Sequence, residues 1–272
     1  MSSAVATSGH PRGRTSRRVG RWAQAWAGVL GVLVLLEIVV RVGLIPSRYF
    51  PPMTTTFRTL FEQLGQSAFW TAVLQTLQGW ALGLAIAALV AIPVGMLIGS
   101  NVYVYRGLRP IIEFLRPIPS VALIPLAILI YGTGMQSKVF LAAFASTWPL
   151  LIQTVYGVRD LDPVQRETAQ SFRISRRDRF LKVSVPGALP YIATGLRISS
   201  ATALVLVVTA ELVIGAPGLG KAINTARAGG VPDLMYALTI ATGLLGVGLN
   251  VLISLAEARV LHWHPSHREA PR

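Results

Sequence analysis

The chain has 272 residues, of which 53% are hydrophobic and only 13% are charged. Soluble globular domains carry roughly 25% charged residues, so this composition excludes an ordinary soluble domain, and its hydrophobicity excludes a disordered chain. Lysine and arginine number 25 against 11 aspartates and glutamates, and the formal charge of +14 leaves a nucleic-acid-binding protein open at this point. Cysteine is absent, which excludes disulfides and cysteine-based metal or redox sites.

Six apolar stretches predict membrane-spanning helices, because a bilayer core of about 30 Å takes about 20 apolar residues of α-helix. In chain order they are Ala25–Val42, Phe69–Gly99, Pro117–Gly132, Val139–Val158, Tyr191–Ile214 and Leu234–Ala256. The third is short and rich in proline. Lipid cannot satisfy free backbone groups, so a helical form is expected for each stretch. The sequence therefore predicts an all-α membrane protein with about six transmembrane helices.

The first apolar stretch follows a basic tail and so has the outline of a signal peptide. It continues through Glu37 and Arg41 without a small-x-small cleavage pattern behind it. We interpret it as a retained span, with the two charges, four residues apart, forming a local ion pair. A short surface helix with an apolar face is predicted shortly after it, over Thr54–Gly65.

The basic residues are concentrated on one side of the predicted spans. Eighteen of the 25 fall in the N-terminal tail, the connections 100–116 and 159–189, and the C-terminal end, whereas five, including Lys138, fall on the other side. The positive-inside bias places the basic side in the cytoplasm, together with both termini. Because the charge is divided among short segments and forms no single stripe, the pattern disfavours nucleic-acid binding.

These assignments divide the chain into three parts. A cytoplasmic basic tail covers 1–24, a transmembrane domain covers 25–262 and a second cytoplasmic tail covers 263–272. The spans and their short connections leave no room for a separate soluble domain.

The longest cytoplasmic connection carries cap signals for two helices. Asp162 and Pro163 mark an N-cap and a first helical position. Ser175 and Asp178, three residues apart, predict the start of a second helix that ends near Val183. On these signals alone the segment is equally compatible with a solvated hairpin.

The same connection resembles the EAA loop of ABC importer permeases, in which Glu-Ala-Ala is followed by Gly, Ile and Pro at fixed spacing. The residues in the places of that motif are Glu167, Thr168, Ala169, Arg173, Val183 and Pro186. Thr168 replaces the first alanine, and Arg173 replaces the glycine. A glycine there would end the first helix in a left-handed conformation. Arg173 therefore either adopts that backbone, at a cost of roughly 1–2 kcal/mol, or the turn differs.

Further segments resemble the branch of this family that imports sulfonates, taurine and nitrate. They are Tyr49–Pro52, Arg116–Ser120, Pro190–Arg197, Ala210–Leu212 and Gly218–Gly220. The resemblance covers about residues 25–262 and implies a type I ABC importer permease fold in a bacterial inner membrane. It also implies a homodimer that works with cytoplasmic ATPase subunits and an extracytoplasmic solute-binding protein. The chain is then expected to be a transport subunit without enzyme activity or cofactor, since ATP and Mg would be bound by the ATPase.

In such permeases the EAA loop docks onto the ATPase. The residues to which the resemblance gives this coupling role are Glu167, Thr168, Ala169, Phe172, Arg173 and Pro186. Glu167 would offer a carboxylate to a basic partner, and the face from Ala169 to Phe172 would offer an apolar contact. The imported solute is expected to be a small organic or inorganic anion, such as a sulfonate, taurine or nitrate.

Charged residues and helix breaks inside the spans are candidates for the translocation pathway. These candidates are Arg116, Pro117, Pro119, Ser120, Arg197 and Glu211. Arg116 or a helix N-terminus beside it would attract an anion, although the prolines are equally compatible with a simple kink. Arg197 and Glu211 lie about 21 Å apart along one predicted helix. Each therefore either lines the pathway or forms an interhelical salt bridge.

One motif resembles a nucleotide-binding loop but does not fit that function. Gly215–Ala222 reads GAPGLGKA and matches part of a P-loop, but Ala222 replaces the residue that would hold magnesium. A P-loop also follows a buried strand, whereas this segment follows a predicted span. We interpret it as an external turn between the fifth and sixth spans, with a short helix and loop over Lys221–Asp233.

Other functional classes are disfavoured by what the spans contain. The histidines lie outside them, which excludes a membrane-embedded Ser–His site, and the histidines near the C-terminus are expected to be solvated, so no metal site is predicted. A secondary transporter or a channel without an ATPase is the alternative. Such transporters usually carry internal repeats, and none is evident in this sequence.

Overall fold

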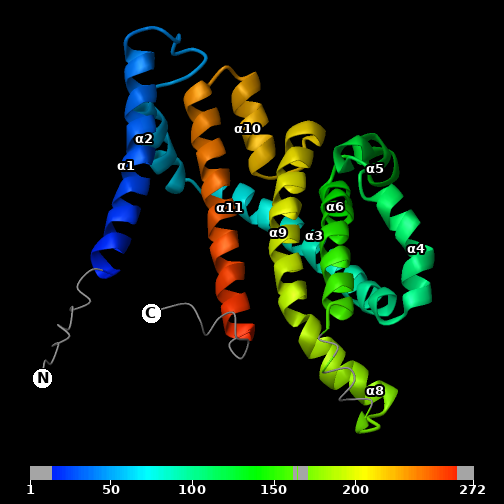
Figure 1. The fold of residues 1–272 in the computed structure, drawn as a ribbon. Helices are drawn as coiled ribbons and strands as arrows, with labels where there is room; N and C mark the ends of the chain where they lie inside the picture. Colours follow the sequence, from blue (N-terminus) through cyan, green and yellow to red (C-terminus); the bar gives the residue numbers. More distant parts are fainter. Residues whose placement is uncertain (1–13, 162–163, 165–170, 262–272) are drawn as a thin grey trace, which may run out of the picture.

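The computed structural model describes residues 14–161, 164 and 171–261, apart from the side chains of 14–26, 29 and 176. In chain order the helices are α1 (Arg14–Arg41), α2 (Met53–Leu64), α3 (Ser67–Ser100), α4 (Val102–Leu115), η1 (Ser120–Leu123), α5 (Ile124–Tyr131), α6 (Met135–Arg159), α8 (Arg176–Arg179), η2 (Phe180–Ser184), α9 (Val185–Ile214), α10 (Leu219–Ala228) and α11 (Pro232–Val260). Within the described residues there is no strand, so the predicted all-α fold class is confirmed (Figure 1). The loop residues Asp162, Pro163, Glu167, Thr168 and Ala169 lie outside the description, as do the C-terminal tail and residues 1–13. The rest of the predicted N-terminal tail, 14–24, is the start of α1.

Four of these helices are long and apolar enough to cross a membrane. They are α3, α6, α11 and the run Arg177–Ala228, which contains α9. They coincide with the second, fourth, sixth and fifth predicted spans, and the 28-residue α1 coincides with the first. In Figure 1, α6, α9 and α11 run side by side, and α3 passes obliquely behind them.

The boundaries predicted for the third span were wrong. The region begins earlier than predicted, with α4 before Pro117. After a turn, η1 and α5 occupy most of Pro117–Gly132, at an angle of 79° to α4. The side chain of Asn101 caps α4 by accepting hydrogen bonds from the N–H groups of Tyr103 (2.9 Å) and Val104 (3.4 Å), where the sequence analysis predicts only a connection. Two prolines in the turn prevent a continuous helix. Among the described residues, four helices are candidate spans, or five if this bent pair is a single broken span.

α6 packs between α3 and α9 through small residues. A Cβ atom on Gly83 of α3 would lie 2.6 Å from the Ala142 Cβ, and one on Gly157 of α6 would lie 2.7 Å from the Tyr191 Cβ. Small residues allow such close approach, which drives helix association in a membrane through van der Waals packing. The buried side chains of this central core are Ala91, Met96, Ile98, Leu150, Leu151, Val155, Val158, Ala188 and Ile192.

A second core lies at the end of the bundle opposite to α8, where the short helices α2 and α10 pack against α3 and α11 (Figure 1). Its buried side chains are Leu60, Phe69, Leu219, Ile223, Ala237, Leu238 and Ala241, from α2, α3, α10 and α11. α2 is the predicted surface helix. Its first turn is tied to α1, because Glu37 accepts hydrogen bonds from Thr54 Oγ1 (2.9 Å) and from Arg41 Nε (2.6 Å). The predicted ion pair of α1 is therefore confirmed.

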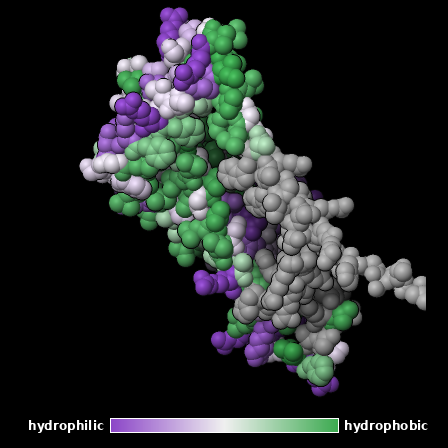
Figure 2. Space-filling model, turned by 90° about the vertical axis from the view of Figure 1, so that its left-hand side faces the viewer, coloured by the Kyte–Doolittle hydropathy of each residue, from purple (hydrophilic) through white to green (hydrophobic). Residues whose placement is uncertain are grey.

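Large apolar side chains face outward along the long helices. Leu89 of α3, Leu129 of α5 and Leu255 of α11 are 76%, 82% and 64% exposed. On the face shown in Figure 2, hydrophobic residues form a broad band, and hydrophilic residues gather toward its upper and lower ends. An apolar surface of this kind is stable against lipid or against another protein chain.

Candidate functional site

The segment between α6 and α9 contains a turn at Arg173, where the backbone is left-handed. Within the described part of the chain, Arg173 is the one non-glycine residue with a positive φ, which is +48°. Of the two alternatives left by the sequence, Arg173 thus adopts the conformation that a glycine would take, at a cost of roughly 1–2 kcal/mol. Phe172, directly before it, is 77% exposed.

The helix after this turn begins where the capping signal predicts. The Asp178 N–H donates to Ser175 Oγ at 3.1 Å, and Ser175 Oγ donates to Asp178 Oδ2 at 2.8 Å. Lys182 lies one turn further along, with its Nζ 2.8 Å from Asp178 Oδ1. Hydrogen bonds from Lys182 and then from Ser175 hold the pKa of the Asp178 carboxyl below its ordinary value. The carboxylate is therefore ionised at neutral pH and keeps the cap in place.

The predicted end of this helix near Val183 was wrong. α8 continues through a π-helical turn, η2, directly into α9. The Val185 N–H bonds five residues back, to the Phe180 carbonyl. Pro186 follows in the first turn of α9 and has no N–H to donate, so the wider π turn accommodates a position where an α-helical hydrogen bond is missing. The segment is therefore a continuous extension of α9.

This extension is also fixed to the end of α6. The Tyr191 hydroxyl donates to Asp160 Oδ2. A Cβ on Gly187 would lie 2.2 Å from Leu161 Cδ2, so this glycine lets the Leu161 side chain pack closely against α9. The start of α9 and the end of α6 are therefore in direct contact.

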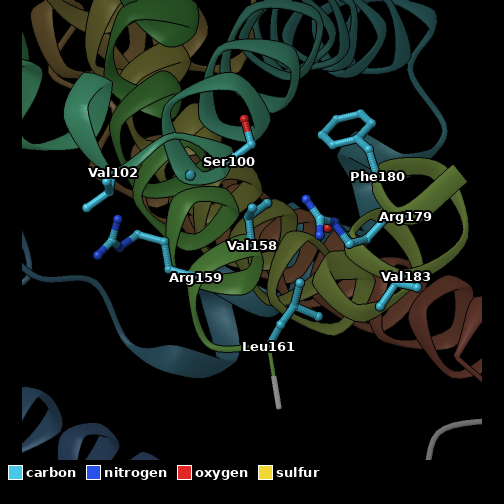
Figure 3. A pocket seen from close by; sticks show the side chains of 10 residues that line it. Ser100, Val102, Val158, Arg159, Leu161, Arg179, Phe180 and Val183 are labelled. Carbon is cyan, nitrogen blue, oxygen red and sulfur yellow. The ribbon is translucent and has the colours of Figure 1, made fainter. Parts of the chain in front are cut away.

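A groove of about 400 Å³ opens between this extension and the ends of α3, α4 and α6 (Figure 3). Its lining residues are Gly99, Ser100, Val102, Val158, Arg159, Leu161, Arg179, Phe180, Val183 and Ser184. In Figure 3 the Arg179 side chain extends into the groove, whereas Arg159 points toward Val102. The Arg159 guanidinium stacks 3.8 Å from the centroid of the Tyr105 ring. The groove is thus basic and lies beside the segment that resembles the EAA loop.

At the other end of the bundle, Glu211 and Lys138 form a fully buried ion pair. Lys138 Nζ lies 2.7 Å from Glu211 Oε1, and both side chains are 0% exposed. The ammonium also donates to the carbonyls of Gln75 (2.9 Å) and Pro217 (2.6 Å). Thr76 Oγ1 donates to Glu211 Oε2 at 2.9 Å. The pair therefore joins α3, α6 and α9, and it is the interhelical salt bridge named as the alternative for Glu211.

The glycine-rich segment after α9 folds onto this pair. The Gly220 N–H donates to Glu211 Oε2 at 3.0 Å, and the Leu219 N–H donates to Thr76 Oγ1 at 2.9 Å. A Cβ on Gly218 would lie 2.0 Å from Glu211 Oε1. The segment is thus the turn that the sequence predicts between two spans, and the predicted short helix follows as α10. Its glycines approach a buried carboxylate of the same chain.

The remaining charged candidate, Arg197, also forms an interhelical contact. Its guanidinium donates to Glu257 of α11 and is 43% exposed. Arg197 and Glu211 thus lie at separate places along α9, in separate ion pairs.

Arg116 and Ser120 do come together, at the break between α4 and α5. They line a cavity of about 290 Å³ whose other walls come from α6 and α9. The lining residues are Arg116, Ser120, Ala145, Trp148, Pro149, Ile152, Gln153, Ile198 and Thr202. Pro117 and Pro119 form the break itself, between the end of α4 and the start of η1. The predicted helix interruption is therefore present, as a sharp bend beside a cavity.

Three residues of these sites escaped the sequence analysis. Lys138 was counted only among the basic residues of the external side, and its complete burial in the first turn of α6, beneath the glycine-rich turn, was not predicted. Thr76 resembles any hydroxyl within a span. Trp148 belongs to no recognisable motif; the only nearby signal is Pro149, a proline inside α6.

Comparison with known proteins identifies the family. The model of the family described as "Binding-protein-dependent transport system inner membrane component" matches residues 91–262. The taurine transport system permease protein TauC of Escherichia coli is 33% identical over 87% of this chain and 88% of its own length. The nitrate import permease protein NrtB of Leptolyngbya laminosa is 33% identical over 72% and 70%. The bicarbonate transport system permease protein CmpB of Synechococcus elongatus is 31% identical over 86% and 88%.

Solved structures agree on the fold. An inward-facing structure of the MetNI methionine ABC transporter matches with a TM-score of 0.61 and 21% identity, over 72% of this chain and 95% of that chain. The type I importer permease fold is thus confirmed. The alternative of a transporter without an ATPase does not agree with the family match. The chain belongs to the inner-membrane components of binding-protein-dependent ABC importers, as a multi-pass permease subunit without catalytic activity or a cofactor of its own.

Proposed function

We propose that two copies of this chain form the import pathway for a small anion, driven by two cytoplasmic ATPase subunits and supplied by an external solute-binding protein. α1 begins and α11 ends on the same side of the bundle as α8, which supports a cytoplasmic location for both termini (Figure 1). The excess of basic residues on that side supports the same orientation.

The relatives named for nitrate and bicarbonate support an anionic substrate, and the relative named for taurine supports at least a sulfonate-bearing one. The cavity at the α4–α5 break agrees with them, since Arg116 is the charged residue among those that line it. Arg116, Pro117, Pro119 and Ser120 are accordingly proposed as pathway residues. Arg197 and Glu211 are proposed to hold the helices that border the pathway.

The segment that resembles the EAA loop is proposed to receive the motion of the ATPase. Glu167, Thr168, Ala169, Phe172, Arg173 and Pro186 carry this role. The observation that carries the proposal is an apolar side chain, Phe172, that is 77% exposed just before the extension of α9, whose Tyr191 donates to Asp160 at the end of α6. An exposed aromatic residue on a rigid support is suited to bury itself in a partner's groove. Closure of the ATPases would then shift the helices between inward-open and outward-open arrangements.

The test is a charge placed at this contact. We expect Phe172→Asp to abolish binding-protein-stimulated ATP hydrolysis and nitrate uptake in proteoliposomes, because a carboxylate would have to be desolvated in the ATPase groove. Val260→Asp is the matched control, since Val260 is 51% exposed at the end of α11, outside the coupling segment. Full stimulation and uptake with Phe172→Asp, in the amount of inserted protein found for Val260→Asp, would contradict the coupling role.

A further inference from the structure

The cavity at the α4–α5 break lies near the middle of the bundle along its length and is partly open, since Arg116 of its lining is exposed. Trp148 of its wall is thirteen residues from Met135 and eleven from Arg159, the two ends of α6. At about 1.5 Å per residue these separations are about 20 Å and about 16 Å, which places the cavity near mid-membrane. Substrate sites of transporters commonly lie at this depth, beside interrupted helices.

The polar groups of the cavity are mostly hydrogen-bond donors without partners. Trp148 Nε1 is buried and has no hydrogen-bond partner among the described residues. An indole N–H can only donate, so a buried one without an acceptor costs free energy unless a ligand or water accepts from it. Arg116 adds a guanidinium that takes part in none of the ion pairs of the described residues. The Ser120 hydroxyl and the Gln153 amide add further donors.

The cavity is correspondingly poor in groups that would bind a cation. None of the lining residues that the structure describes is an aspartate or glutamate. Glu113, one turn before Arg116, is bound to Arg109 of the same helix at 2.7 Å. The Thr202 hydroxyl donates to the Ile198 carbonyl at 3.0 Å, which leaves its oxygen as an acceptor only. The cavity therefore carries one positive charge and a surplus of donors.

We propose that this cavity is an oxyanion-binding site within the permease, in which Arg116 and the Trp148 N–H bind a small planar anion such as nitrate or bicarbonate. At about 290 Å³ it lies at the small end of ligand pockets, which typically measure about 300–1,000 Å³. A zwitterion such as taurine carries an ammonium group for which the lining has no carboxylate. The permease thus adds its own selection to that of the solute-binding protein. This inference rests on the proposed import of anions and specifies the group that recognises them.

The test is equilibrium binding to the permease–ATPase complex in nanodiscs, without the solute-binding protein, by titration calorimetry with sodium nitrate, sodium bicarbonate and taurine. We expect nitrate and bicarbonate to bind more tightly than taurine. Arg116→Gln should weaken nitrate binding about tenfold or more, because a hydrogen bond to a charged group is lost together with the charge. Trp148→Phe keeps an aromatic ring but removes the N–H, and should weaken nitrate binding about threefold to tenfold.

Two matched variants control for folding. Arg106→Gln removes an exposed guanidinium of α4 outside this cavity, and Trp70→Phe removes an indole N–H that donates to the Leu64 carbonyl at 2.9 Å. Both should bind nitrate as the parent does. Equal nitrate affinity in Arg116→Gln and the parent, equal loss in Arg106→Gln, or no binding of any of the three solutes to the parent would overturn the inference. Import that depends on Phe172 but keeps its selectivity in Arg116→Gln would overturn it while leaving the proposed function in place.

Discussion

Changing Lys138 to methionine tests whether the buried ion pair holds three helices together. In the folded protein the Lys138 ammonium donates to Glu211 Oε1 at 2.7 Å and to the carbonyls of Gln75 and Pro217 at 2.9 Å and 2.6 Å. Methionine is similarly long but uncharged, so the carboxylate would keep only a hydroxyl and a backbone N–H as donors. Removing one partner of a buried ion pair typically costs about 3–5 kcal/mol. We expect Lys138→Met to lose about that much folding free energy.

Thermal unfolding of the complex in nanodiscs measures this loss, with the assembled fraction read by size exclusion after heating. At about 2–4 °C per kcal/mol for a chain of similar size, Lys138→Met should lower Tm by about 6–20 °C. Arg58→Met is the control, because it breaks an ion pair with Glu62 whose side chains are 82% and 57% exposed. Such exposed pairs are worth at most about 1 kcal/mol.

A second variant separates charge from packing. Lys138→Met combined with Glu211→Gln removes both charges and leaves an amide oxygen to accept the hydrogen bonds of Thr76 and Gly220. We expect this double variant to unfold at a higher temperature than Lys138→Met alone, since no uncompensated charge is buried. The reasoning is refuted if Lys138→Met unfolds at the temperature of Arg58→Met, or if the double variant is no more stable than the single one.

Three further predictions concern backbone conformation, helix packing and coupling. Arg173→Gly should stabilise the coupling segment by about 1–2 kcal/mol, seen as slower amide exchange from Phe172 onward; unchanged exchange would contradict a strained turn. Gly157→Ala should destabilise the bundle by about 1–3 kcal/mol through overpacking, whereas Gly107→Ala, whose Cβ would have nothing within 4 Å, should not; equal Tm values would contradict the close contact. Glu167→Ala with Ala169→Asp should abolish uptake and ATPase stimulation while membrane insertion persists, and retained uptake would refute the coupling role.

The positions of the long helices could be predicted from hydropathy, because each span must be apolar over about 20 residues whatever its neighbours are. The predicted stretches that became α3, α6, α9 and α11 needed no knowledge of their neighbours. The third span differed because its boundary depends on a helix start at Asn101 and on prolines that turn the chain by 79°. A mean hydropathy does not distinguish one bent pair from a single short helix.

Pairing between distant residues could not be predicted in the same way. Lys138 and Glu211 are 73 residues apart, and each looks like an interfacial charge at the end of its own span. Both are buried because α6 packs against α3 and α9 and the glycine-rich turn folds over the pair. The cavity is another such case. Arg116 was a candidate because of its charge, whereas Trp148 became one only when the structure placed it beside the α4–α5 break. By contrast, the Ser175–Asp178 cap is local and was predicted correctly.

The central claim is tested most directly by nitrate accumulation in proteoliposomes that contain this permease, its ATPase subunits and its solute-binding protein. We predict accumulation that requires all three components and ATP inside the vesicle compartment that corresponds to the cytoplasm, and that disappears with Phe172→Asp. Nitrate, bicarbonate and taurine are compared side by side, so the substrate class is read in the same experiment. Equal accumulation without the ATPase or without ATP would contradict the account.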